Sequence, residues 1–375
     1  MEHGGDIYGN QNIELDFSVN LSPIGPPEGV LKALKGDDMQ KALTSYPDPQ
    51  YRELRAALSK KLAIPEEWLL CGNGASELLT AAVQAVRPGR AVIPVPTYLG
   101  YERVLEAVDA QILFCEMDRE KGFALTDDLF DGRGGLKELA ESSRGSGSNS
   151  MLFLCNPNNP VGNCIDPALL NKIAEYCRTE HIYLVVDECY LDLLPDVESR
   201  TKLPALADNP YLIIVSAFTK TYAMPGVRLG YLMTSNSELR AKIQLQQPEW
   251  SVSMLAQKAG IAALRDKDYL NRARQAIRME REYICEKLRE SGAEVFEGEG
   301  PFVLFISGKE LYEPLKERGI LIRRCGGIRG IRNEAEDGGS AEKESADGGH
   351  YYRVGVKSHD ENVRLMRSIG EIMGL

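Results

Sequence analysis

The stretch Tyr211-Leu-Ile-Ile-Val-Ser-Ala-Phe-Thr-Lys220 decides the fold class of this 375-residue chain. Its first half is an unbroken apolar run, and two similar runs, 151–155 and 182–186, precede it. Continuous rather than alternating apolar residues are typical of strands buried on both faces of a mainly parallel sheet. The stretch ends on a lysine just past the predicted strand, with Arg228 eight residues further on.

Predicted strands and helices alternate around these runs. We expect further strands at 68–71, 91–94, 111–116 and 227–234. Amphipathic helices are expected between most of the strands, at 76–86, 98–108 and 167–180. This order predicts an α/β protein with a three-layer α/β/α unit around a mainly parallel sheet.

The pattern changes after residue 234. Helices are expected at 238–245, 252–264 and 269–291, and strands at 294–297, 302–307, 320–324 and 351–357. This order predicts a smaller α+β domain made of 1–45 and 251–375, beside a large domain of 46–250. The polar stretch 141–150 is expected to be a surface connection, and the Gly-, Glu-, Asp- and Ser-rich stretch 326–350 a flexible insertion.

Composition excludes several classes of protein. The formal net charge of −11 argues against a nucleic-acid or anionic-membrane partner, and no apolar stretch approaches the roughly 20 residues of a membrane span. The eight cysteines show no CxxC pair and the four histidines no metal-ligand spacing. With no secretory signal at the start of the chain, we expect a cytoplasmic protein with reduced thiols and no metal.

Four segments lie at strand ends or helix starts, where open α/β sheets bind ligands. They are Gly72-Asn-Gly-Ala-Ser-Glu77, Asn156-Pro-Asn-Asn-Pro-Val-Gly162, Val186-Asp-Glu-Cys-Tyr190 and the stretch from Lys220 to Arg228. Free amides at a helix start bind phosphate, and a lysine that loses hydration becomes a nucleophilic amine. Each segment also has an ordinary structural explanation, as a turn, a helix N-cap or a solvated lysine.

In this order, the four segments resemble those of the fold type I pyridoxal phosphate (PLP) enzymes, the class I/II aminotransferase superfamily. The resemblance implies PLP as cofactor, a small amino acid as substrate and a homodimer. It implies that Lys220 bonds covalently to the cofactor aldehyde and that Asp187 pairs with the ring nitrogen. It also implies that Tyr98 stacks on the ring, while Asn159 and Tyr190 bind the ring 3′ oxygen.

The resemblance further implies a phosphate site and a substrate site. The phosphate site would consist of Gly74, Ala75, Ser76, Thr219 and Arg228, with Tyr46 reaching in from the neighbouring subunit. The substrate site would consist of Asn20, Arg323 and Arg353, in which Arg353 holds the substrate carboxylate and Arg323 is a candidate for its phosphate. The chain departs from the family at Ala217, where a serine or threonine is common. Ser216 is expected to point to the opposite face of the strand.

Two branches of the superfamily fit the motifs. The histidinol-phosphate aminotransferases share Asn-Pro-Asn-Asn-Pro and Asp-Glu-x-Tyr. The threonine-phosphate decarboxylases of cobalamin biosynthesis are similar over further stretches, Asp16-Phe-Ser-Val-Asn20, Trp250-Ser-Val252 and Ile320-Leu-Ile-Arg-Arg-Cys325. We therefore expect a PLP enzyme most like L-threonine-O-3-phosphate decarboxylase. An aminotransferase of the histidinol-phosphate type is the alternative, and a non-catalytic PLP-binding protein a distant one.

Overall fold

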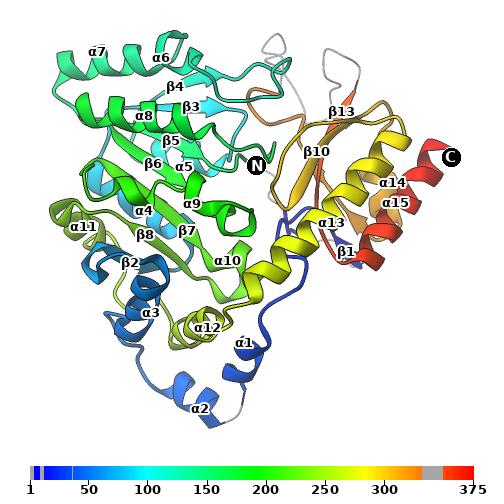
Figure 1. Cartoon of the computed structure of the whole chain (residues 1–375), viewed down its shortest axis with the longest axis horizontal. Helices are drawn as coiled ribbons and strands as arrows, with labels where there is room; N and C mark the ends of the chain where they lie inside the picture. The colour runs from blue at the N-terminus through cyan, green and yellow to red at the C-terminus, as the bar shows by residue number, and fades with distance from the viewer. Residues whose placement is uncertain (1–3, 9–11, 36, 332–348) are drawn as a thin grey trace.

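A seven-stranded sheet forms the centre of the larger part of the molecule (Figure 1). The computed structural model describes residues 4–8, 12–35, 37–331 and 349–375. The strands lie in the order β2 (Leu69–Gly72), β8 (Gly230–Met233), β7 (Leu212–Ala217), β6 (Tyr183–Asp187), β5 (Ser150–Cys155), β3 (Arg90–Val95) and β4 (Gln111–Glu116). β8 is antiparallel to both of its neighbours and the other pairs are parallel. The prediction of a mainly parallel sheet is confirmed.

The unbroken apolar runs are explained by the two buried faces of this sheet. Every residue of β5 and β7 is buried. Successive side chains of β6 pack into the hydrophobic cores on opposite faces of the sheet. Leu184 and Val186 belong to the core on one face, and Val185 belongs to the core on the other. Because side chains alternate along a strand, a strand covered on both sides needs an apolar residue at every position.

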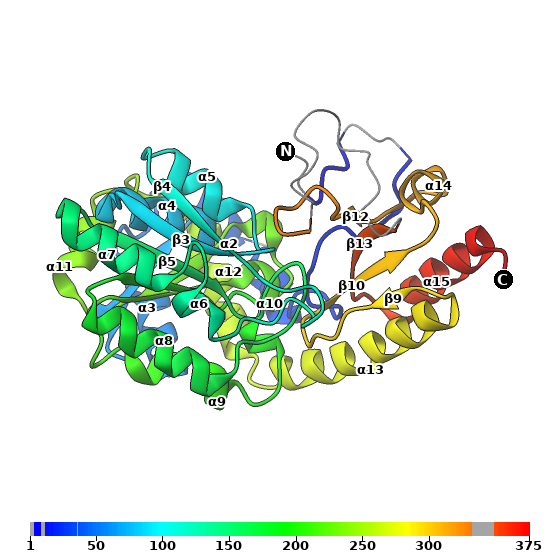
Figure 2. The same ribbon diagram turned by 90° about the horizontal axis from the view of Figure 1, so that it is seen from above.

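Helices cover both faces of the sheet, as predicted for a three-layer unit (Figures 1 and 2). One face carries α4 (Ala75–Val86), α5 (Gly100–Glu106) and α11 (Ser237–Gln244). The other carries α3 (Arg52–Leu62), α6 (Asp128–Asp131), α7 (Leu136–Ser146), α8 (Pro167–Thr179) and α12 (Met254–Arg265). The short helices α9 (Val197–Arg200) and α10 (Phe218–Thr221) follow β6 and β7 in the chain.

Two sequence predictions were wrong in detail. The stretch 141–150 is not a simple surface connection, because α7 continues to Ser146 and β5 begins at Ser150. The Ser142 and Ser143 hydroxyls donate to the Leu139 carbonyl at 2.8 and 2.7 Å, so these polar residues are accommodated inside the helix. The strand predicted from residue 227 begins only at Gly230, because a 3₁₀ turn, Pro225–Val227, precedes it.

The smaller part of the molecule is built on a four-stranded antiparallel sheet. Its order is β12 (Arg323–Arg324), β13 (His350–Gly355), β10 (Phe302–Ser307) and β9 (Glu294–Val295). It packs with α13 (Tyr269–Glu290), α14 (Tyr312–Glu317) and α15 (His359–Met373). The N-terminal segment joins this part through β1 (Leu15–Asp16), which pairs in parallel with β11 (Ile320–Leu321).

Core packing continues past residue 250, the expected end of the large domain. The core on the α12 face of the large sheet includes Val30 of α1 (Glu28–Ala33) and extends along α13 to Ile277. The second half of α13 contributes Ile284 and Leu288 to the core of the small sheet. The division of the chain at 250 remains a prediction, and this packing favours a later boundary within α13. The remaining helix, α2 (Asp37–Thr44), lies between α1 and α3 in the chain.

Within the described ranges, no helix combines the length and the apolar character that crossing a membrane requires.

We expect Leu184→Ala to lower the free energy of unfolding by about 2–5 kcal/mol, because it leaves a cavity in the centre of the sheet. The Leu184 side chain is fully buried. Met279→Ala is the control, since Met279 is 56% exposed on α13. Urea unfolding followed by circular dichroism measures both variants. Equal effects at the two positions would contradict the packing described.

Candidate active site

A cavity of about 280 Å³ lies at the carboxyl ends of the parallel strands and is also lined by residues of the small sheet. Most of the residues predicted for the site line this cavity. They are Asn20, Ala75, Ser76, Tyr98, Asn159, Asp187, Tyr190, Thr219, Lys220, Arg228, Arg323 and Arg353. Ala217 also lines the cavity. The structure therefore brings together residues that lie more than 300 positions apart in the chain.

Lys220 is a buried amine in α10, directly after β7. Burial lowers the pKa of its side chain to about 8, and the nearby Arg353 and Arg228 cations act in the same direction. Asp187 opposes them more weakly. The backbone of Lys220 is held by the N-terminal segment, since the Ser22 amide donates to the Lys220 carbonyl at 3.0 Å. The site thus holds an amine that loses its proton at a lower pH than an exposed lysine.

Asp187 is the last residue of β6 and is held by two directed hydrogen bonds. The Tyr101 hydroxyl donates to its Oδ2 at 2.8 Å, and the Cys189 amide donates to its Oδ1 at 3.0 Å. Burial raises the pKa of Asp187, while these hydrogen bonds and Lys220 favour the ionised form. The sequence analysis missed Tyr101. The available signal was its spacing of three residues from Tyr98, which places both rings on one side of a helix start.

Tyr98 is an aromatic residue of the cavity lining and packs against Tyr101. The rings of Tyr98 and Tyr101 meet edge to face with centroids 5.3 Å apart, and Tyr101 packs on Phe153 at 5.2 Å. These ring contacts hold Tyr98 in the same cavity lining as Lys220 and Asp187.

The start of α4 lies at the cavity, where Ala75 and Ser76 belong to the lining. Gly74 is the N-cap residue, has a φ of 84° and offers no side chain to cap the helix. A Cβ at this position would lie 2.5 Å from the Arg228 guanidinium, so only glycine lets that arginine approach. Free helix-start amides beside an arginine are suited to phosphate. Thr219 adds a hydroxyl to the lining of the same cavity.

Arg353 is a buried arginine with an incomplete set of partners. Its Nη2 donates to the Ser18 carbonyl at 2.7 Å and its Nη1 to Asn159 Oδ1. Within the described part of the chain its Nε has no hydrogen-bond partner, and neither has Asn20 Oδ1. Asn20 Nδ2 donates to the Tyr190 hydroxyl at 3.5 Å. Buried polar groups are normally satisfied, so these atoms indicate a site for a ligand that accepts and donates hydrogen bonds.

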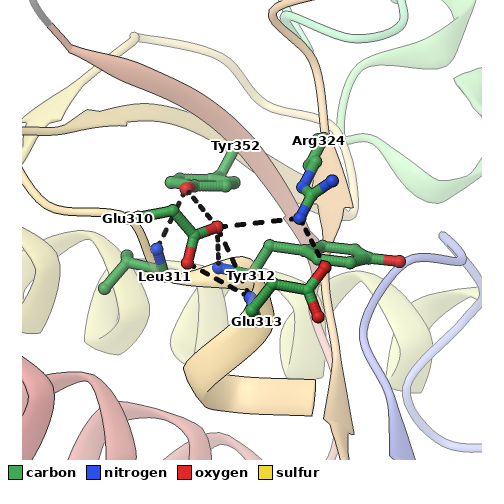
Figure 3. A network of polar contacts seen from close by, with 6 residues as sticks. All are labelled: Glu310, Leu311, Tyr312, Glu313, Arg324 and Tyr352. Atoms are coloured by element: carbon green, nitrogen blue, oxygen red, sulfur yellow. Dashed lines mark hydrogen bonds and ion pairs between the residues drawn. The ribbon is translucent and has the colours of Figure 1, made fainter. Parts of the chain in front are cut away.

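Arg323 lines the cavity, and its neighbour on β12, Arg324, belongs to a polar network with Glu310, Glu313 and Tyr352 (Figure 3). Its neighbour Arg324 contacts Glu313 at 2.7 Å and lies over the Tyr312 ring at 3.8 Å. Because successive side chains on a strand point to opposite faces, anchoring Arg324 there turns Arg323 to the cavity side. Arg323 is the register partner of Arg353 on β13.

Tyr46 is absent from the cavity lining of this single chain. Its ring is 79% exposed and packs against Trp250 with centroids 4.9 Å apart. The predicted role of Tyr46 belongs to a neighbouring subunit, so it stays a prediction.

Asn156 and Asn158 support the loops of the site. Asn158 accepts from the Thr97 hydroxyl and donates to the Pro96 carbonyl, both at 2.9 Å. The Asn156 side chain accepts from the Ile165 amide at 3.0 Å. Of the asparagines in this motif, Asn159 is the one that lines the cavity. Ser216 is absent from the cavity lining, as its strand position predicts.

The insertion predicted at 326–350 is not flexible along its whole length. Residues 326–331 are packed, because Ile328 and Ile331 are buried and Arg329 makes an ion pair with Glu102. Residues 332–348 lie outside the described part of the chain.

The buried amine, the hydrogen-bonded carboxylate and the arginine beside the start of α4 lie in or beside one cavity on a mainly parallel sheet, an arrangement expected of a fold type I PLP-dependent enzyme. The family profile "Aminotransferase class I and II" matches residues 12–332. The chain belongs to this family, and it is a PLP-dependent enzyme.

The relatives include both expected branches. The chain is 31% identical to threonine-phosphate decarboxylase of Salmonella typhimurium over 99% of this chain and 96% of the relative. It is 29% identical to histidinol-phosphate aminotransferase 2 of Archaeoglobus fulgidus over 96% and 93% of the two chains. The crystal structure of histidinol-phosphate aminotransferase from Clostridium acetobutylicum superposes with a TM-score of 0.79 and 26% identity, covering 96% of this chain and 99% of the other.

We expect the pH dependence of the stability of the cofactor-free protein to show that the Lys220 amine is buried. With the pKa of Lys220 lowered from 10.5 to about 8, the unfolded chain binds more protons than the folded chain between these values. Burial of the charged Lys220 amine therefore destabilises the folded chain fully below pH 8. This destabilisation is lost as the pH rises from 8 to 10.5. Lys220→Met should melt at a higher temperature than wild type at pH 7, by a margin that shrinks towards pH 10.5.

Lys60→Met is the matched control, because Lys60 is exposed. Melting temperatures measured from pH 7 to 10.5 decide the outcome. A constant margin for Lys220→Met, or the same margin for Lys60→Met, would show that the Lys220 amine is not buried as described.

Proposed function

We propose that this enzyme acts on a small amino acid that carries a second anionic group, and that it is most like L-threonine-O-3-phosphate decarboxylase. The observation that carries the proposal is the pair Arg353 and Arg323, register partners on adjacent strands that both line the cavity. A carboxylate held by one arginine and a phosphate held by the other would occupy both cations. The similarity to the Salmonella typhimurium decarboxylase supports this assignment.

The residues of the cavity fit PLP. Lys220 would hold the aldehyde, Asp187 the ring nitrogen, Asn159 and Tyr190 the ring oxygen, and Tyr98 the ring face. The phosphate would be held at the start of α4 by Gly74, Ala75 and Ser76, together with Thr219 and Arg228. When bound, PLP supplies an electron sink for the charge that develops at the substrate Cα.

The protein groups then have separate tasks. Lys220, with a pKa of about 8 in the cofactor-free protein, is suited to accept or return a proton at the substrate Cα near neutral pH. Tyr101 and the Cys189 amide hold the Asp187 carboxylate in one orientation. Arg353 would fix the direction of the substrate carboxylate. It also donates to Asn159, so a residue proposed for the substrate contacts one proposed for the cofactor ring.

The second candidate is an aminotransferase of the histidinol-phosphate type. The same two arginines could hold the two carboxylates of an amino-group acceptor such as 2-oxoglutarate, and the relative from Archaeoglobus fulgidus supports this assignment. The two reactions differ in which bond at the substrate Cα breaks, the bond to hydrogen or the bond to the carboxylate carbon. Arg353 would favour one or the other through the direction in which it holds the substrate carboxylate.

We expect the PLP-loaded enzyme to release carbon dioxide from L-threonine phosphate without forming glutamate. Incubation with histidinol phosphate and 2-oxoglutarate is the parallel assay, and glutamate formed there without carbon dioxide in the first assay would select the aminotransferase. Lys220→Ala should abolish turnover and change the absorbance of bound cofactor. Absence of both products with cofactor still bound would reject both substrate assignments.

We also propose a homodimer in which Tyr46 completes the neighbouring site. In the single chain Ser76 and Arg228, at the phosphate end of the cavity, are exposed, as is Tyr46 itself. A second subunit that covers this end would exclude water from the phosphate, and the exposed Tyr46–Trp250 pair offers an aromatic surface for such a contact.

Mixed dimers test this arrangement. We expect Tyr46→Ala and Lys220→Ala to be strongly impaired separately, because each damages every site of its own homodimer. When the two variants are co-expressed with different tags, random pairing should restore roughly a quarter of wild-type activity, since one site in each mixed dimer is intact. Mixed dimers without restored activity would show that Tyr46 serves its own chain.

The eight cysteines are free thiols in the structure. This is consistent with a reducing compartment, and we include a cytoplasmic location in the proposal.

A further inference from the structure

The segment 325–331 forms a strap that runs from the small sheet to the large domain. It leaves β12 with the Cys325 amide bonded to the Tyr351 carbonyl at 2.8 Å. Two successive turns follow, in which the Ile328 amide donates to Cys325 at 2.9 Å and the Ile331 amide to Ile328 at 3.0 Å. The strap therefore has its own local hydrogen bonds and a defined path.

The far end of the strap is fixed to the large domain by two residues. Arg329 lies over the Phe114 ring at 4.0 Å and contacts Glu102 at 3.4 Å. Gly330 has a φ of 83°, and a Cβ there would lie 2.6 Å from the Pro96 nitrogen and 2.7 Å from the Val95 carbonyl carbon. The backbone of the strap thus rests directly on the end of β3, at a position that accepts only glycine.

Ile328 is the residue of this strap that lines the cavity. Its side chain is 6% exposed and belongs to an apolar cluster with residues of both domains, including Phe123 and Val161 from the large one. Leu99 packs against the same cluster and also lines the cavity. Ile328 and Leu99 therefore contribute an apolar wall to the same cavity that Arg323 and Arg353 line.

This wall constrains what fits beside the two arginines. A substrate whose anionic groups contact Arg353 and Arg323 has its aliphatic carbons between them, and an apolar wall stabilises a short aliphatic chain there. It offers no hydrogen-bond partner for a ring nitrogen, and its position is fixed by the strap, so a bulky side chain meets a surface that cannot move away.

We propose that Ile328 is a specificity-determining residue, which limits the substrate to amino acids with short aliphatic side chains, and that Arg329 and Gly330 position it. This inference rests on the proposed function, because it assumes a substrate held by both arginines. It goes further in naming the feature that separates a threonine-sized substrate from a larger one that bears a ring.

Four variants and two substrates test the proposal. L-Threonine phosphate and L-tyrosine phosphate carry the same charged groups but differ in side-chain size. Ile328→Ala removes the apolar wall, and Gly330→Ala displaces the strap through its backbone. Ile331→Ala is the control for the cluster, since Ile331 shares it but is absent from the cavity lining. Gly326→Ala is the control for the strap, because no atom of the residues that the structure describes lies within 4 Å of its would-be Cβ.

In wild type we expect kcat/KM to favour threonine phosphate. In Ile328→Ala and Gly330→Ala the ratio of the two kcat/KM values should fall about tenfold or more, mainly through KM for the smaller substrate. The ratio should be unchanged in Ile331→Ala and Gly326→Ala. An unchanged ratio in Ile328→Ala, or an equal fall in Ile331→Ala, would overturn the proposal.

A binding measurement separates this inference from the proposed function. Each phosphorylated amino acid is titrated into PLP-loaded enzyme and the change in cofactor absorbance gives a dissociation constant without turnover. If wild type binds threonine phosphate more tightly than tyrosine phosphate but converts neither, the proposed reaction fails while the size limit stands. If the two bind equally to wild type, the role of Ile328 is rejected whatever the reaction.

Discussion

The site depends on a buried amine and a buried carboxylate that line the same cavity. Lys220 and Asp187 come from the ends of neighbouring strands, and both pKa values are shifted by burial towards the neutral form. Each group therefore needs the other, or a ligand between them, to carry its charge at low cost. The two-sided core of the sheet makes this possible, because it holds both strand ends rigidly under the cavity.

The N-terminal segment connects this pair to the small domain. The Phe17 amide donates to Leu321 at 2.7 Å and its carbonyl accepts from Gly355 at 2.8 Å. The Ser18 carbonyl holds Arg353, and the Ser22 amide holds the backbone of Lys220. A few residues thus set the distance between the substrate arginine and the reactive amine. The strap 325–331 makes a second connection, so the small domain contacts the cavity from two directions.

Much of the fold was predictable because it follows from short-range patterns. The apolar runs identified β5, β6 and β7, since a strand buried on both faces has no place for a polar residue. Lys220 and Asp187 could be named because motifs at strand ends converge on one edge of a parallel sheet. The helical end of α7 was missed, because its serines donate their hydroxyl groups to a carbonyl of the same helix. Only the three-dimensional structure shows these hydrogen bonds.

By itself the sequence determined the fold class, the family and the place of Lys220 directly after a buried strand, because strand periodicity and local motifs encode them. Only the tertiary structure decided that Tyr101 holds Asp187, that Ser18 holds Arg353 and that Ile328 enters the cavity. These contacts join residues between 86 and 335 positions apart, or depend on a backbone that rests on another domain. No local pattern specifies such pairs, since they arise from how segments far apart in the chain pack against one another.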